Sequence, residues 1–152
     1  MHLFLQKFQR QVLMTGNSKQ VDLEKYAVFV DGVTSNPSKD YKSFLDSIEY
    51  LDGEGSNIQR LLTAAVGISA EGGEFMEIIK KMLFQGKPWN DDNREHLIIE
   101  LGDVMWYVMQ ACKALDVSLD EVIAGNVEKL KKRYPGGDFD VYHSENRAAD
   151  DR

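Results

Sequence analysis

Four acidic residues in two short motifs are the part of the chain best suited to chemistry. Glu71 and Glu74 lie three residues apart in "AEGGEFMEIIKK", and Glu100 and Asp103 repeat that spacing in "EHLIIELGDVMWYV". Residues three apart share one face of an α-helix. The first pair shares its face with small or apolar residues, namely Ala64, Gly67 and Ile78. The spacing therefore predicts two helices that turn carboxylates toward the interior of the protein.

The two acidic pairs are expected to lie level with each other. In an antiparallel helical hairpin, the register that sets Glu71 opposite Asp103 also sets Glu74 opposite Glu100. Both pairs are centred on position 87 of the sequence, which is Lys87. Lys87 lies in the middle of "QGKPWN", where glycine and proline indicate a turn independently of the acids. The position of the loop thus supports the pairing.

Four converging carboxylates need a compensating charge. Taking a carboxylate out of water costs on the order of several kcal/mol, and four together also repel one another. Two hard divalent cations would compensate for both effects, and oxygen-only ligands favour Mg²⁺, Mn²⁺ or Ca²⁺ over Zn²⁺ or Cu²⁺. The alternative is that each acid is a solvated side chain with an ion-pair partner. The second pair at matching height favours the metal interpretation for Glu71, Glu74, Glu100 and Asp103.

Basic and amide side chains gather on one face of a third predicted helix. That face carries Asn126, Lys129 and Arg133. Metal ions on one side and basic donors on the other are typical of a polyphosphate site. Lys81, one turn beyond the first acidic pair, fits the same site, although a solvated lysine that stabilises the end of its helix is an equal alternative.

Three further side chains have two interpretations each. Tyr107 either donates a hydrogen bond to a phosphate or sugar, or simply fills the core. Trp89 in the loop would stack on a base, or would cap the end of the bundle. His96 shares the face of Glu100 and fits a helix-surface or packed histidine better than a ligand.

The elements that must position these residues are predicted to be helices. The three prolines (Pro37, Pro88 and Pro135) all lie at joints. Capping boxes are predicted at Ser56 with Gln59 and at Ser118 with Glu121. Residues 1–13 read as a short amphipathic helix rather than a signal peptide, and residues 21–40 as a short helix and a loop broken at "VTSNPS". The longer predicted helices cover about residues 39–52, 56–84, 94–116 and 118–133.

The composition excludes two classes of partner. The 152 residues carry a formal net charge of −7 and have a pI of about 4.9, so the chain lacks the basic surface that a nucleic-acid polymer requires. No apolar run is long enough for a membrane span. The one cysteine, Cys112, cannot form an internal disulfide and fits a reducing compartment, which we take as the cytoplasm.

The chain resembles a MazG-type nucleoside triphosphate pyrophosphohydrolase of the all-α superfamily in three segments, "GISAEGGEFMEIIKK", "EHLIIELGDVMWYV" and "NVEKLKKRYP". The similarity covers about residues 57 to 147, including "HSENRA" in the tail. It implies an all-α fold, a helical bundle of about four to five helices that a homodimer or homotetramer completes. It also implies hydrolysis of a nucleoside triphosphate substrate to a monophosphate and pyrophosphate, with Mg²⁺ as cofactor and Mn²⁺ as a substitute.

The resemblance also implies roles for individual residues. The four acids would carry the metals, and Glu74, then Glu71, are the candidates for the carboxylate that orients the attacking water. Many relatives have two adjacent glutamates where this chain has Ala70 and Glu71, so the choice between these two stays open. Tyr107 matches a family position near the substrate. The phosphates would be held by Lys81, Asn126, Lys129 and Arg133.

The predicted organisation is a single domain in three parts. Residues 1–55 form an N-terminal helical extension packed on the core, residues 56–135 form the MazG-like catalytic core, and residues 136–152 form a polar tail. The alternatives are a relative specific for dUTP or phosphoribosyl-ATP, a non-catalytic helical binding or regulatory module, and a carboxylate-bridged redox metal protein.

Overall fold

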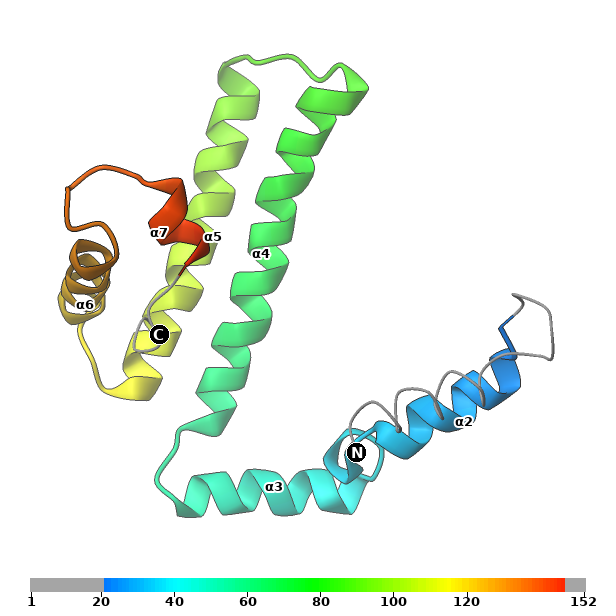
Figure 1. Ribbon diagram of the computed structural model, residues 1–152. Coiled ribbons are helices and arrows are strands. Elements are labelled where there is room, and N and C mark those ends of the chain that lie inside the picture. Colours follow the sequence, from blue (N-terminus) through cyan, green and yellow to red (C-terminus); the bar gives the residue numbers. More distant parts are fainter. Residues whose placement is uncertain (1–20, 147–152) are drawn as a thin grey trace. The chain divides into compact units, whose positions relative to one another are not determined.

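The computed structural model describes residues 21–146, which form six α-helices and one 3₁₀-helix and contain no β-strand (Figure 1). The predicted all-α fold is therefore confirmed. The helix predicted within residues 1–13 lies outside the described residues. In chain order the elements are α2 (Leu23–Val33), η1 (Asn36–Ser38), α3 (Tyr41–Gly53), α4 (Ile58–Gln85), α5 (Asp91–Leu115), α6 (Leu119–Arg133) and α7 (Val141–Glu145).

The chain divides into two compact units, with the boundary between Tyr50 and Leu51. In the first unit, the carboxylate of Asp22 caps α2 by accepting a hydrogen bond from the backbone N–H of Lys25 at 3.1 Å. Pro37 lies in η1, which separates α2 from α3. The helix and loop predicted for residues 21–40 are thus confirmed. No helix of the described part of the chain is long and apolar enough to cross a membrane.

The second unit is built on an antiparallel hairpin of the two longest helices, α4 and α5 (Figure 1). Gly86 ends α4 in the left-handed conformation at φ 71°, which favours glycine. Asn90 begins α5, and its side-chain oxygen accepts a hydrogen bond from the N–H of Asn93 at 3.0 Å. The turn predicted at "QGKPWN" is therefore confirmed. The buried apolar side chains of the described residues all lie in this hairpin, and they are Ala64, Ile78, Leu97 and Cys112.

The predicted cap of α4 is wrong by one residue. The N-cap is Asn57, whose side-chain oxygen accepts a hydrogen bond from the N–H of Arg60. The hydroxyl of Ser56 instead donates to the carbonyl of Leu51 at 2.7 Å. The Ser56 hydroxyl thus bonds back to α3, and the cap of α4 is provided by the next residue.

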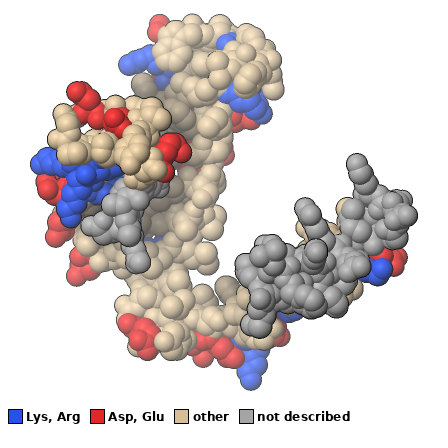
Figure 2. Space-filling model, in the orientation of Figure 1, with Lys and Arg blue, Asp and Glu red and all other residues tan. Residues whose placement is uncertain are grey.

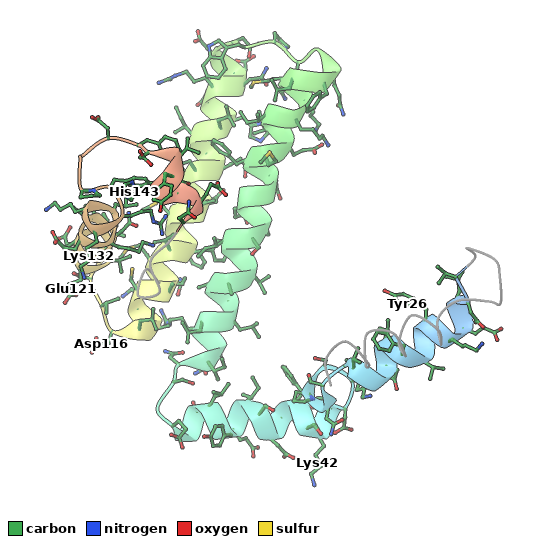
Figure 3. The ribbon with its side chains drawn as sticks, viewed as in Figure 1. Tyr26, Lys42, Asp116, Glu121, Lys132 and His143 are labelled. Carbon is green, nitrogen blue, oxygen red and sulfur yellow. The ribbon has the colours of Figure 1, made fainter. Side chains whose placement is uncertain are left out.

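A sharp turn connects α5 to α6. Asp116 caps α5 in the left-handed conformation and lies at this turn (Figure 3). Ser118 and Glu121 then form the predicted capping box, with the Ser118 N–H donating to the Glu121 carboxylate at 2.7 Å and the Glu121 N–H donating to the Ser118 hydroxyl at 3.1 Å. The tail holds the short helix α7, which the sequence analysis did not predict.

Candidate active site

Helix α4 buries the face that carries its two acids. Its buried residues are Ala64, Gly67 and Ile78, which are the residues predicted to share a face with Glu71 and Glu74. Glu71 is half-buried and Glu74 is exposed. The 3.6-residue period thus places both carboxylates on the side of α4 that meets α5.

Helix α5 brings a third carboxylate to the same level. Glu100 is buried, with 8% of its side chain exposed. One carboxylate oxygen from each of Glu71, Glu74 and Glu100 lies within 4.8 Å of the others. We call these three residues the carboxylate cluster. Its geometry agrees with the hairpin register predicted from the sequence, because that register sets Glu74 opposite Glu100.

Asp103 lies one turn beyond Glu100 and is exposed. It is not one of the three residues whose oxygens converge within 4.8 Å. Its charge nevertheless acts on the cluster, since it is one of the three carboxylates that raise the pKa of Glu71. The structure therefore brings three of the four predicted metal ligands together and leaves the fourth at their edge.

The pKa of Glu71 is raised above its usual value. The largest cause is loss of solvation, and the charges of Glu74, Asp103 and Glu100 add to it in that order. Each cause disfavours the ionised carboxylate. Concentrated negative charge of this kind is what a divalent cation would neutralise.

Tyr107 lies against the backbone of α4. A Cβ atom on Gly67 would overlap the Tyr107 ring, so the two helices approach closely at this point. The Tyr107 ring also packs edge-on against Trp106, with ring centroids 4.8 Å apart. Tyr107 is half-buried, and its ring position is therefore fixed by packing on two sides.

The predicted phosphate-binding residues are spread over two helices. Lys81 lies near the end of α4 and pairs with the Glu77 carboxylate at 3.3 Å. On α6, Asn126 is exposed, whereas Lys129 and Arg133 are half-buried. Trp89 in the loop between α4 and α5 is exposed over 69% of its surface.

His96 makes a contact that was not predicted from the sequence. Its Nε2 lies 2.9 Å from Oε1 of Glu100, one helical turn further along α5. The four-residue spacing was a visible signal, because side chains at i and i+4 meet on a helix surface. Spacing alone did not reveal that the imidazole turns toward the buried carboxylate.

A cavity of about 570 Å³ opens elsewhere in the second unit, where the start of α4 meets the turn between α5 and α6. None of the residues predicted from the sequence as site residues lines it. This cavity is therefore not part of the candidate site. Its lining residues are Asn57, Arg60, Cys112, Lys113, Asp116, Val117 and Ser118.

Comparisons with known proteins identify the family of the second unit. Residues 59–137 match the family model of the MazG nucleotide pyrophosphohydrolase domain, a segment of just over half the chain that contains every predicted site residue. The chain is also 38% identical over 86 residues to the Gene 37 protein of Mycobacterium phage L5, which is 56% of this chain and 75% of the phage protein. No solved structure matches the chain.

Proposed function

The chain belongs to the MazG nucleotide pyrophosphohydrolase family, and we propose that it hydrolyses ribo- or deoxyribonucleoside triphosphates between the α and β phosphates. The products would be a nucleoside monophosphate and pyrophosphate. The observation that carries the proposal is the carboxylate cluster, in which side chains from α4 and α5 converge within 4.8 Å. A family match without convergent carboxylates would fit a binding module equally well.

The donor set of the cluster fits Mg²⁺, with Mn²⁺ as a substitute. All of its ligand atoms are carboxylate oxygens, which hard divalent cations prefer. Glu71, Glu74, Glu100 and the adjacent Asp103 would hold the ions. Bound there, the ions would neutralise charge on the phosphate oxygens and so favour attack on the α-phosphorus.

Glu74 is our candidate for the residue that orients the attacking water. It is the exposed member of the cluster, whereas Glu100 is buried and Glu71 is half-buried. A water molecule can therefore reach its carboxylate, which would accept the proton that the water loses. Glu71 is the second candidate, because its pKa is raised above the usual value and its carboxylate is therefore a stronger proton acceptor than an ordinary glutamate.

The remaining proposed roles concern substrate binding. Lys81, Asn126, Lys129 and Arg133 would hold the phosphate oxygens. Tyr107, fixed against Gly67, would contact the sugar or a phosphate, and the exposed indole of Trp89 would stack on the base. Cationic donors hold phosphate oxygens by charge-assisted hydrogen bonds, which are stronger than neutral ones.

We also propose that a second copy of the chain covers part of the hairpin, as a homodimer or within a homotetramer. The face of α4 opposite its buried residues carries exposed apolar side chains, namely Leu62, Val66, Met76 and Leu83. Few charged side chains lie along α4 in the view of Figure 2. Exposed apolar side chains that gather on one face of a helix mark interaction sites. Sedimentation should therefore give a mass of at least twice the 17.3 kDa of one chain.

The proposed compartment is the cytoplasm. Cys112 is a free thiol buried in the hairpin, where it packs as a small apolar side chain. A reducing compartment keeps such a thiol intact. Localisation of a tagged full chain by microscopy or fractionation tests this proposal.

The reaction is tested with a panel of ribo- and deoxyribonucleoside triphosphates, with and without Mg²⁺, in water enriched in ¹⁸O. Monophosphate and pyrophosphate should form only with the metal, and the label should enter the monophosphate because attack is on the α-phosphorus. Glu74→Gln and Asp103→Asn should abolish turnover and keep the helical circular dichroism. Glu95→Gln, on α5 but outside the cluster, is the control and should keep activity.

Other outcomes would point to the alternatives. Diphosphate and phosphate as products would move cleavage to a different bond and contradict the proposed reaction. Turnover of dUTP or phosphoribosyl-ATP alone would narrow the substrate class. Absence of turnover with every substrate would favour a binding or regulatory module.

A further inference from the structure

His96 makes a contact that neither the family match nor the proposed roles explain. Its Nε2 lies 2.9 Å from Oε1 of Glu100, and the two residues are four apart on α5. Half of the His96 side chain is exposed, whereas 8% of the Glu100 side chain is exposed. The imidazole therefore reaches from the surface to the buried member of the carboxylate cluster.

A buried carboxylate needs such a partner. Removing a carboxylate from water is costly unless hydrogen bonds replace those lost to solvent. The Nε2 of His96 lies within reach of Oε1 of Glu100, and an imidazole in its neutral form would add no positive charge beside the cluster. A lysine at this position would also satisfy Glu100, but its charge would oppose a divalent cation bound nearby.

The contact also limits how Glu100 can turn. A glutamate side chain has three rotatable bonds, and burial alone does not fix the plane of its carboxylate. A contact that holds one oxygen restricts that plane, and Glu100 is the residue whose carboxylate also converges with those of Glu71 and Glu74. Hydrogen bonds to ligating groups from residues behind them orient metal ligands in this way.

We infer that His96 is a positioning residue whose Nε2, through its 2.9 Å contact with Oε1 of Glu100, orients this carboxylate to share a divalent cation with Glu71 and Glu74. The inference rests on the proposed function, because it assumes that the cluster binds a metal. His96 is not itself a ligand in this arrangement. Its effect is on the affinity of the cluster for the ion.

The test measures binding of Mn²⁺ alone to the full chain, without substrate, by the electron paramagnetic resonance signal of the free ion. His96→Ala should raise the Mn²⁺ dissociation constant about 10- to 100-fold, which is the usual effect of removing such a partner. His96→Gln, whose amide can donate to Glu100, should recover most of the loss. If His96→Ala loses its helical circular dichroism, His96→Leu keeps the bulk of the side chain and serves in its place.

The matched control is His143→Ala. His143 also lies beside a carboxylate, with its Nδ1 3.2 Å from Asp140, but that pair is outside the carboxylate cluster. This variant should bind Mn²⁺ within about twofold of the wild type, so that a change specific to His96 is separated from a general effect of losing an imidazole.

Three results would overturn the inference. Wild-type Mn²⁺ affinity in His96→Ala would show that the contact has only a structural role, even if the melting temperature falls. Strong ¹⁴N coupling to bound Mn²⁺ in electron spin echo spectra would make His96 a direct ligand. A wild-type protein that binds no Mn²⁺ would overturn the proposed metal site and this inference with it, whereas the first two results leave the proposed function intact.

Discussion

Gly67 on α4 lies directly against the ring of Tyr107 on α5. A Cβ atom at position 67 would overlap three atoms of that ring, Cγ, Cδ1 and Cε1. An aromatic ring is rigid and has packing partners, so it cannot yield as the end of a flexible side chain would. Glycine at this position therefore allows the two helices to approach each other closely, one turn below the carboxylate cluster.

Gly67→Ala should lower the free energy of unfolding, measured by urea titration, by about 1–3 kcal/mol, because overpacking of a close contact has that cost. A decrease in the free energy of unfolding would be informative, because alanine normally stabilises a helix relative to glycine by about 1 kcal/mol. Gly72→Ala on the same helix is the control, because a Cβ there would meet no atom within 4 Å. It should leave stability unchanged or raise it, and an equal rise at position 67 would contradict the contact.

Glu71→Gln should stabilise the metal-free protein at neutral pH and much less at low pH. The folded protein raises the pKa of Glu71 above its usual value of 4.5, so the folded state holds the proton more tightly than the unfolded chain. The protonated Glu71 carboxyl therefore contributes to the stability of the fold below pH 4.5. This contribution is lost as the pH rises through the pKa of Glu71 in the folded state. Glutamine carries no charge at any pH and avoids that loss.

The measurement for Glu71 is the melting temperature of both proteins between pH 5 and pH 8 in the presence of a chelator. The variant should melt higher at pH 8, and the difference should shrink toward pH 5. Glu95→Gln, which removes a glutamate charge from α5 outside the cluster, is the matched control. A difference of constant size across the range would mean that Glu71 does not titrate differently in the folded state.

Ser118→Ala should cost about 1 kcal/mol of stability. The Ser118 hydroxyl accepts from the Glu121 N–H, and the Glu121 carboxylate accepts from the Ser118 N–H, so the substitution removes one bond of a reciprocal pair. Ser69→Ala is the control, because the Ser69 hydroxyl donates to the carbonyl of Ala65 within α4, a bond that does not cap a helix. Equal urea midpoints for the two variants would contradict the role of the capping box.

The features that sequence predicted well are those set by local rules. Helical periodicity identified the buried face of α4, and the predicted serine cap of α6 acts within one turn of the chain. The hairpin register also follows from local signals, because the position of the turn determines which residues of α4 and α5 lie opposite each other. The same register sets Gly67 opposite Tyr107, and the structure shows these two residues in contact.

The features that sequence did not predict depend on competition or on tertiary contacts. Ser56 and Asn57 are both good caps, and in the structure Asn57 caps α4 whereas the Ser56 hydroxyl donates to the carbonyl of Leu51. Helix α7 has five residues, too few for periodicity to indicate it. The contact between His96 and Glu100 depends on the rotamers of both side chains, which the four-residue spacing permits but does not require.

Lys129→Ala should raise the Michaelis constant for the triphosphate more than it lowers the turnover number, because a lysine that holds a phosphate oxygen in both ground and transition states contributes uniform binding. Lys131→Ala is the matched control on α6, since Lys131 is exposed and pairs with Glu128 at 2.9 Å. That variant should keep both constants. Steady-state kinetics with saturating Mg²⁺ measures the effect, and unchanged constants in Lys129→Ala would remove this lysine from the proposed phosphate-binding residues.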